Sequence, residues 1–444
     1  MGMHYIIKNA TLAENGQVVD VEIADERIVT IGKVSATDAE VIDATGLLLL
    51  PGVIDDHVHF RDPGLTHKAD MHTESCAAAA GGVTSYLEMP NTTPQTTTIE
   101  DLNDKFEDAA RKSVVNYSFF FGATNDNADV LPTLDVHHIP GVKLFMGSST
   151  GNMLVDKREA LLKVFGNTPS CMPVMAHCEE MSIINENTTA IKAAHGDDPD
   201  VSYHPVIRNA QACYESSKLA VEMAKKADAR LHIAHITTAM ELDLLEDKPL
   251  SADKKITGEV CIPHLIFNDS DYNTLGTRIK CNPAVKTASD QEALLAALKN
   301  TDKLDVVGTD HAPHLLSEKQ GGCLKAVSGM PMVQFSLVTM LDLAKEGKIT
   351  YADVVKRMCQ MPATLFGINN RGYIKEGNYA DLVLVNPATE WTLRADDILS
   401  KCKWSPLEGH TFHHKVQYTF CNGHLVYKDG IVDDSYRGKP LSFR

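Results

Sequence analysis

Hydrophobic and polar residues alternate with a period of two at both ends of the chain, a pattern typical of β-strands with one buried face. Near the N-terminus the alternation runs in short pieces through residues 3–50, separated by Gly, Asn and Asp turns. Near the C-terminus it starts at Tyr379 and continues through residues 416–432, where Asn422 and Gly423 form a dipeptide preferred in tight hairpins. We therefore expect the two ends to pair into one small β domain.

Short apolar runs recur between these ends, each followed by a segment with helical spacing. The eight apolar runs cover residues 52–60, 83–91, 114–124, 141–149, 173–180, 230–238, 256–267 and 303–314. Helices are predicted over residues 74–80, 99–112, 207–226, 291–299 and 333–345, whereas the polar stretch 181–206 is predicted to be a long loop or a surface excursion. Eight strand–helix units in roughly 260 residues match the size of a TIM barrel.

The sequence thus predicts an α/β protein with two parts. A TIM (β/α)8 barrel is expected over residues 52–374, and a small β-sandwich domain is expected from residues 1–51 together with residues 375–444. The 444 residues, of which 43% are hydrophobic and 23% charged, have the composition of a globular protein with a large core.

The charge balance and the cysteines limit the partners and the cellular compartment that we expect for the protein. There are 59 acidic and 42 basic residues, and the net charge of −17 argues against nucleic acid or an anionic membrane as a partner. The ten cysteines contain no CxxC pair, the N-terminus lacks a signal-peptide pattern, and the longest apolar run is too short for a membrane span. We expect a cytoplasmic protein with reduced thiols.

Six polar residues fall where barrel strands are expected to end, which is where TIM barrels place their active sites. They are His57, His59, Lys143, His177, His235 and Asp310. Each of them taken singly also fits an ordinary structural role, such as a core histidine, a surface lysine or a helix cap. Their joint placement at the ends of five strands favours a metal site, because zinc accepts imidazole and carboxylate ligands together.

Lys143 needs a chemical explanation, since an ammonium group would repel metal ions. A neutral lysine amine that takes up CO2 becomes a carbamate, whose two oxygens can bridge two cations, and a desolvated site rich in cations favours the neutral amine. Two metal ions about 3.5–4 Å apart can share one hydroxide that is active at neutral pH. Asp310 could then carry the proton from this hydroxide to a leaving nitrogen.

Longer motifs resemble those of the dihydroorotases in the amidohydrolase superfamily, and the resemblance covers nearly the whole chain. The matching segments are HVHFRDPG (57–64), AAAAGGVTSYLEMPNTTP (77–94), VKLFMGSSTG (142–151), MAHCEE (175–180), LHIAHITTA (231–239), KCNPAVK (280–286) and GTDHAPH (308–314). The HxH pair alone marks only the superfamily, whereas HFRDPG, MPNTTP and TDHAPH are more specific. The resemblance implies a barrel of the metal-dependent hydrolase type that holds two Zn2+ per subunit.

The resemblance also implies individual roles for the metal ligands. His57 and His59 resemble ligands of the more buried zinc, which Asp310 joins, and His177 and His235 resemble ligands of the second zinc. The lysine of VKLFMG matches the position at which many members carry a carboxylated lysine that bridges the two ions, so Lys143 is expected to be carboxylated. Asp310 matches the catalytic acid and base.

Five residues resemble substrate contacts of the family, namely His59, Arg61, Asn91, Asn282 and His314. A guanidinium at Arg61 suits a bidentate contact with a carboxylate, and His314 is expected to meet the same carboxylate. Asn91 suits a ring imide because its side-chain amide both donates and accepts hydrogen bonds. Ordinary alternatives remain: Arg61 could pair with the neighbouring aspartate, both asparagines could be turn residues, and His314 could be a loop residue.

Two stretches depart from the family pattern, and a third has two alternative roles. Residues 321–331 lack the Phe-Gly pair that related members have there, which puts substrate contacts around Lys325 and Ala326 in doubt. The strand-seven motif is shifted from the more common PHH, and His264 is expected to lie on this strand in a supporting role. The segment 147–155 is either a lid over the substrate or a plain connection.

The resemblance implies reversible hydrolysis of (S)-dihydroorotate to N-carbamoyl-L-aspartate in pyrimidine biosynthesis. A bridging hydroxide is then the nucleophile, and a small molecule is the partner. The alternatives are another cyclic amidohydrolase (an allantoinase or a dihydropyrimidinase, also called hydantoinase) and a non-catalytic scaffold related to dihydroorotase. The ring substrates of the first alternative lack the carboxylate that Arg61 and His314 would bind. Barrel enzymes of this type are often homodimers, but the sequence marks no interface.

Overall fold

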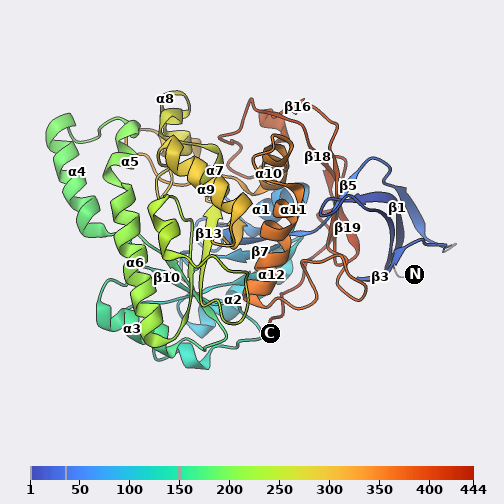
Figure 1. The fold of residues 1–444 in the computed structure, drawn as a ribbon, viewed down its shortest axis with the longest axis horizontal. Coiled ribbons are helices and arrows are strands. Elements are labelled where there is room, and N and C mark those ends of the chain that lie inside the picture. Colours follow the sequence, from blue (N-terminus) through green and yellow to red (C-terminus); the bar gives the residue numbers. More distant parts are fainter. Residues whose placement is uncertain (1–2, 36–37, 148–152) are drawn as a thin grey trace.

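The structure is a computed structural model that describes residues 3–35, 38–147 and 153–444. Figure 1 shows two parts side by side, a barrel surrounded by helices and a curved β-sheet at one end of the long axis. The N-terminal strand β1 lies in this sheet, at the side away from the barrel helices α4 and α6.

Eight parallel strand positions form the barrel wall within the described residues. The strands are β6 (Val53–Val58), β7 (Val83–Glu88), β8 (Asn116–Phe119), β10 (Val142–Phe145), β11 (Pro173–His177), β12 (Arg230–Ile233), β13 (Ile256–Cys261) and β14 (Val306–Gly308). Neighbours pair in parallel, and the short β9 (Phe121–Gly122) continues β8 past Phe120 to reach β10. A parallel bridge between Val58 and His311 closes the ring. The predicted TIM barrel is confirmed.

Helices follow most of the strands and surround the wall. They are α1 (Met71–Ala80), α2 (Ile99–Lys112), α3 (Arg158–Asn167), α4 (Met181–His195), α5 (His204–Ile207), α6 (Ala210–Ala227), α7 (Ile262–Ile266), α8 (Tyr272–Leu275), α9 (Ala288–Asn300), α10 (Ser336–Lys345), α11 (Tyr351–Val355) and α12 (Met361–Phe366). Local signals set their starts: the side chain of Asp70 accepts a hydrogen bond from the Thr73 amide at α1, and Thr98 caps α2 in the same way.

Two expectations about the connections are wrong. The connections 123–141 and 234–255 contain only the 3-10 turns Leu131–Thr133 and Met240–Leu244, so not every strand is followed by an α-helix. The stretch 181–206 is not a loop, because α4 fills most of it. Its apolar residues recur at helical spacing, with Ile184 buried against Ile207, and the polar residues between them obscure this period.

Strands from both chain ends pair in one nine-stranded sheet, as the alternation predicted. They are β1 (His4–Leu12), β2 (Val18–Ala24), β3 (Arg27–Gly32), β4 (Glu40–Asp43), β5 (Leu48–Pro51), β15 (Leu382–Asn386), β18 (Lys415–Cys421), β19 (His424–Lys428) and β20 (Ile431–Val432). The two ends meet where β5 and β15 run antiparallel. A separate two-stranded hairpin consists of β16 (Trp391–Thr392) and β17 (Thr411–Phe412).

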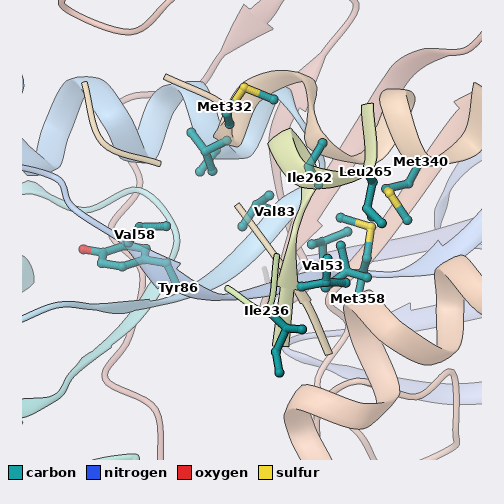
Figure 2. Close-up of a cluster of buried hydrophobic side chains, with 14 of the residues drawn as sticks. Val53, Val58, Val83, Tyr86, Ile236, Ile262, Leu265, Met332, Met340 and Met358 are labelled. Carbon is teal, nitrogen blue, oxygen red and sulfur yellow. The ribbon is translucent and has the colours of Figure 1, made fainter. Parts of the chain in front are cut away.

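The period of two in β15 explains how the sheet packs on the barrel. Leu382 and Leu384 belong to a hydrophobic cluster within the sheet, whereas Val383 and Val385 belong to the large cluster that continues into the barrel. Figure 2 shows part of this large cluster, where Val53 and Val83 of the barrel wall lie among side chains of the surrounding segments. The sheet therefore shares a core with the barrel.

A third cluster fills the inside of the barrel at the end opposite the predicted site. Ile54, Leu87, Met175 and Val306 come from four strands around the ring and form one cluster that includes Phe366 of α12. Within the described parts of the chain, no helix is both long and apolar enough to cross a membrane.

Candidate active site

All ten residues singled out as ligands or substrate contacts line one cavity at the carboxyl ends of the barrel strands. The cavity has a volume of about 580 Å3. Its lining includes His57, His59, Arg61, Asn91, Lys143, His177, His235, Asn282, Asp310 and His314. These residues lie on or directly after the barrel strands or in the loops that follow them, and the closing of the barrel brings them together from distant parts of the chain.

His57, His59 and Asp310 form one group in this cavity. The Nε2 atoms of His57 and His59 lie 3.5 Å and 3.1 Å from Oδ1 of Asp310. One ligand atom from each of these three residues falls within 4.8 Å of the others, close enough to share one metal ion. Asp310 has φ of 47°, a left-handed backbone that non-glycine residues rarely adopt and that is concentrated at functional sites.

His177 and His235 form a second group. Nδ1 of His177 lies 2.9 Å from Nε2 of His235, while Nε2 of His177 lies 3.0 Å from Oε2 of Glu179. Arg208 donates to the same Glu179 oxygen. The carboxylate of Glu179 engages Nε2 of His177, which leaves Nδ1 of His177 free to face Nε2 of His235. Two nitrogens arranged in this way can both bind one ion.

Burial sets the charge of these groups. Burial lowers the pKa of His57, His59 and His235, which favours the neutral imidazole that has a lone pair for a metal. Burial also raises the pKa of Asp310, but His57 and His59 outweigh it and hold this pKa well below its usual range. The site therefore offers neutral nitrogens and an ionised carboxylate, the ligand set that zinc takes.

Lys143 lies in the middle of β10, and its side chain is completely buried. Its Nζ atom has no hydrogen-bond partner among the described residues. Burial lowers the pKa of Lys143, although Glu259 and Asp310 oppose the shift. A buried amine with no partner costs free energy, so this atom points to a group that the protein chain itself does not supply.

Arg61, Lys68 and His314 converge on one side of the cavity. Arg61 donates through Nε to the carbonyl oxygen of Pro313 at 2.9 Å, and its Nη2 lies 2.8 Å from Nε2 of His314. Nζ of Lys68 lies 3.0 Å from the other ring nitrogen of His314. The alternative pairing of Arg61 with Asp62 is not observed, because Oδ2 of Asp62 lies 3.0 Å from Nζ of Lys112 and pairs with this lysine instead.

The two asparagines each contact a histidine. Oδ1 of Asn91 lies 2.8 Å from Nδ1 of His59, which turns the other nitrogen of His59 toward Asp310. Oδ1 of Asn282 lies 3.1 Å from Nε2 of His204, which also contacts the carbonyl oxygen of Cys281. Both side chains line the cavity.

The loop over residues 321–331 forms part of the cavity wall despite lacking the Phe-Gly pair. Residues 323–329 line the cavity. Buried Lys319 supports them by donating to the carbonyl oxygens of Lys280, Val327 and Gly329 at 3.0, 2.9 and 2.7 Å. Burial lowers the pKa of Lys319 to about 7. The segment 147–155 falls largely on residues 148–152, which lie outside the described residues.

In this region the prediction from the sequence placed one residue on the wrong element and missed three others. His264 lies on the short helix α7 rather than on a strand, and its Nε2 contacts the carbonyl oxygen of Pro283 at 3.0 Å. Lys68 was missed because nothing in its local sequence marks it. Glu179 and Glu259 were missed although a signal existed: Glu259 is a charged residue inside the apolar run of β13, and Glu179 follows β11 directly.

Comparison with known proteins shows the family and the fold to which this chain is similar. The profile described as the Amidohydrolase family matches residues 48–426. A dihydroorotase of Halobacterium salinarum is 34% identical over 438 residues, which cover 98% of this chain and 99% of that protein. An allantoinase of Bacillus velezensis is 31% identical, with 97% and 95% covered. An L-hydantoinase (dihydropyrimidinase) structure from Arthrobacter aurescens has a TM-score of 0.93 at 26% identity, covering 100% of both chains.

A closed barrel with histidines, a lysine and an aspartate at its strand ends is the architecture of a metal-dependent hydrolase. The chain belongs to the amidohydrolase family. The predicted class of enzyme, a cyclic amide hydrolase, is confirmed at that level. Members of this family are typically metal-dependent, and the ligand atoms of His57, His59 and Asp310 lie close enough together to hold an ion.

Proposed function

We propose that the protein catalyses the reversible hydrolysis of (S)-dihydroorotate to N-carbamoyl-L-aspartate, a step of pyrimidine biosynthesis. The observation that carries the proposal is the convergence of Arg61, Lys68 and His314 on one side of the cavity. Dihydroorotate has a ring carboxylate, whereas allantoin and dihydrouracil do not.

The hydrogen bonds of His314 support an anion at this place. Burial and the nearby Arg61 and Lys68 lower the pKa of His314, so its ring is neutral. A neutral imidazole has one N–H and one acceptor nitrogen, yet both nitrogens face cationic donors. One of these contacts is therefore unmatched, and a carboxylate placed between the three side chains would accept from all of them.

The charge of the cavity also supports an anionic substrate. Its lining includes Arg61, Lys68, Arg208, Lys280 and Lys325, in a protein whose net charge is −17. Local cations in an acidic protein favour an anionic substrate over a neutral one and raise its local concentration. Neutral rings such as dihydrouracil gain nothing from this field.

The two histidine groups fit two zinc ions. His57, His59 and Asp310 would hold one ion, His177 and His235 the second, and a carboxylated Lys143 would bridge them. The buried amine of Lys143 has no hydrogen-bond partner among the described residues, which supports the bridge. When bound, the ions would activate water at neutral pH and polarise the amide carbonyl.

The chain's own residues would handle the substrate and the proton. Arg61 and His314 would hold the ring carboxylate, and Asn91, Asn282 and His59 would orient the ring amide. Asp310 is ionised and lies beside both histidines of its group, so it can take the proton of the attacking water. It would then give this proton to the ring nitrogen as the carbon–nitrogen bond breaks.

A direct test compares dihydroorotate with dihydrouracil, which has the same ring without the carboxylate. We expect the zinc-loaded protein to open dihydroorotate with a kcat/KM at least about a hundredfold higher, since charged hydrogen bonds are worth about 1.5–3 kcal/mol each. Equal or faster opening of dihydrouracil would reject the proposal. The allantoinase relative makes allantoin the second substrate to include.

A further inference from the structure

Glu259 connects the two histidine groups from beneath the cavity. It lies on β13, its side chain is completely buried, and it does not line the cavity within the described residues. Its carboxylate oxygens lie 3.0 and 3.2 Å from Nδ1 of His57. Its Oε2 also accepts a hydrogen bond from the backbone amide of His235 at 2.8 Å. One carboxylate thus contacts a residue of each group.

The contact with His57 fixes which nitrogen is free. Both oxygens of Glu259 contact Nδ1 of His57, and an acceptor at this nitrogen favours the tautomer with the proton on Nδ1. The lone pair of the ring is then on Nε2, which faces Asp310 at 3.5 Å. A carboxylate behind a histidine sets the tautomer and orientation that a metal ligand needs.

The contact with His235 fixes a strained backbone. His235 has φ of 39°, in the left-handed region that β-carbon-bearing residues avoid. Its amide is held by Glu259, and in this conformation its ring places Nε2 within 2.9 Å of Nδ1 of His177. Such strain persists only where surrounding contacts hold it, and the hydrogen bond to Glu259 is one such contact.

The neighbouring strand leaves room for this carboxylate. A β-carbon added to Gly308 of β14 would lie 2.1 Å from Oε1 of Glu259 and 2.9 Å from Oδ1 of Asp56. A side chain at Gly308 would therefore displace the carboxylate of Glu259. The absence of a side chain at this position is a second, independent feature that preserves the arrangement.

We propose that Glu259 is a positioning residue that orients one ligand of each zinc ion, so that the affinities of the two ions depend on one carboxylate. This inference rests on the proposed two-zinc site. Glu179 provides the matched comparison, because it is also a buried glutamate behind a ligand but contacts only His177 of the two histidine groups.

The experiment measures zinc affinity and stoichiometry by competition with a chelator for the wild type, Glu259→Gln and Glu179→Gln. A glutamine at 259 that kept its carbonyl oxygen on the His235 amide would place an N–H2 group at the position of Oε1, 3.2 Å from Nδ1 of His57, and would remove the carboxylate behind this ring. We expect Glu259→Gln to weaken both ions by about 10–100-fold and Glu179→Gln to weaken one only. Substitution with Co2+ should show altered visible spectra for both ions in Glu259→Gln.

Gly308→Ala and Cys261→Ala complete the design. Gly308→Ala should also weaken the binding of both ions, and it replaces Glu259→Gln if that variant does not fold. The ligand atoms of His57, Glu259 and Cys261 also lie within 4.8 Å of one another, so direct ligation by Glu259 and Cys261 is the rival arrangement. Cys261→Ala should keep both ions at wild-type affinity if Glu259 acts by positioning.

The results separate the inference from the proposed function. Wild-type affinity for either ion in a folded Glu259→Gln protein would overturn the inference alone. Loss of zinc in Cys261→Ala would also overturn it, because Glu259 would then be a ligand. A wild-type protein that binds no zinc would overturn the proposed site and this inference together.

Discussion

Nδ1 of His177 and Nε2 of His235 lie 2.9 Å apart at the carboxyl ends of two neighbouring barrel strands. Glu179 contacts the far nitrogen of His177 at 3.0 Å, which directs the near nitrogen toward His235. Burial keeps the imidazole of His235 neutral by lowering its pKa. The pair has the arrangement of two ligands that share one ion, and it leads to the first prediction.

His235→Ala should remove one of the two zinc ions. The variant should contain about one zinc per chain instead of about two, and its turnover should fall on the order of a hundredfold or more, because both ions act on the same reaction centre. Elemental analysis after dialysis measures the zinc content. His195→Ala is the control, since His195 is exposed on α4. Two retained zinc ions in His235→Ala would contradict the assignment.

Lys143→Ala should lose most of the activity, because the proposed bridge between the two ions is lost. In the wild type, 13C-labelled bicarbonate should give a carbamate carbon signal by NMR that Lys143→Ala lacks. Lys163→Ala tests for a general effect of removing a lysine, since Lys163 is exposed on α3. A full rate in Lys143→Ala would refute the bridging role.

Arg61→Met should raise the KM for dihydroorotate by about tenfold to a hundredfold, which corresponds to the loss of one or two charged hydrogen bonds. Lys68→Met should have a smaller effect in the same direction, because Lys68 also pairs with Glu318 at 2.8 Å. Any residual opening of dihydrouracil should not change in either variant. An equal loss for both substrates would show that Arg61 acts on structure rather than on the carboxylate.

The stability of the metal-free protein should depend on pH through Glu179. Burial raises the pKa of this carboxyl, but Arg208 and His177 outweigh it and lower the pKa to about 2 from 4.5. A carboxyl whose pKa is lower in the folded state stabilises that state above its unfolded pKa, and this stabilisation is lost as the pH falls toward 2.

Glu179→Gln should therefore lower the free energy of unfolding by roughly 3 kcal/mol at pH 7, since each pKa unit corresponds to about 1.4 kcal/mol. The difference from the wild type should fall to about half at pH 3. Urea unfolding of the metal-free proteins at both pH values measures this. A difference that stays constant between pH 7 and pH 3 would contradict the assignment of the pKa shift to Glu179.

The sequence predicted the site better than its surroundings. The ends of barrel strands follow from apolar runs that stop at a histidine or an aspartate, so residues such as His57 and Asp310 could be placed before any contact was known. Glu259 stands out as a charge inside an apolar run, but its contacts with His57 and His235 could not be predicted, because they depend on how β13 pairs with its neighbours. Helix α4 was missed because only one of its residues, Ile184, is buried.

Some expectations remain predictions. The division of the chain at residues 51/52 and 374/375 is one of them. Val383 of the sheet belongs to the same hydrophobic cluster as the barrel residues, so the sheet packs closely on the barrel. A homodimer and a cytoplasmic location are others. The two alternatives for the segment 147–155, a lid or a plain connection, are predictions as well.

The most direct test of the account is a comparison of kcat/KM for dihydroorotate, allantoin and dihydrouracil with the same zinc-loaded preparation. The account predicts that dihydroorotate is opened at least about a hundredfold more efficiently than either neutral ring. It also predicts that N-carbamoyl-L-aspartate is closed to the ring by the same protein. Faster opening of allantoin or dihydrouracil than of dihydroorotate would contradict it.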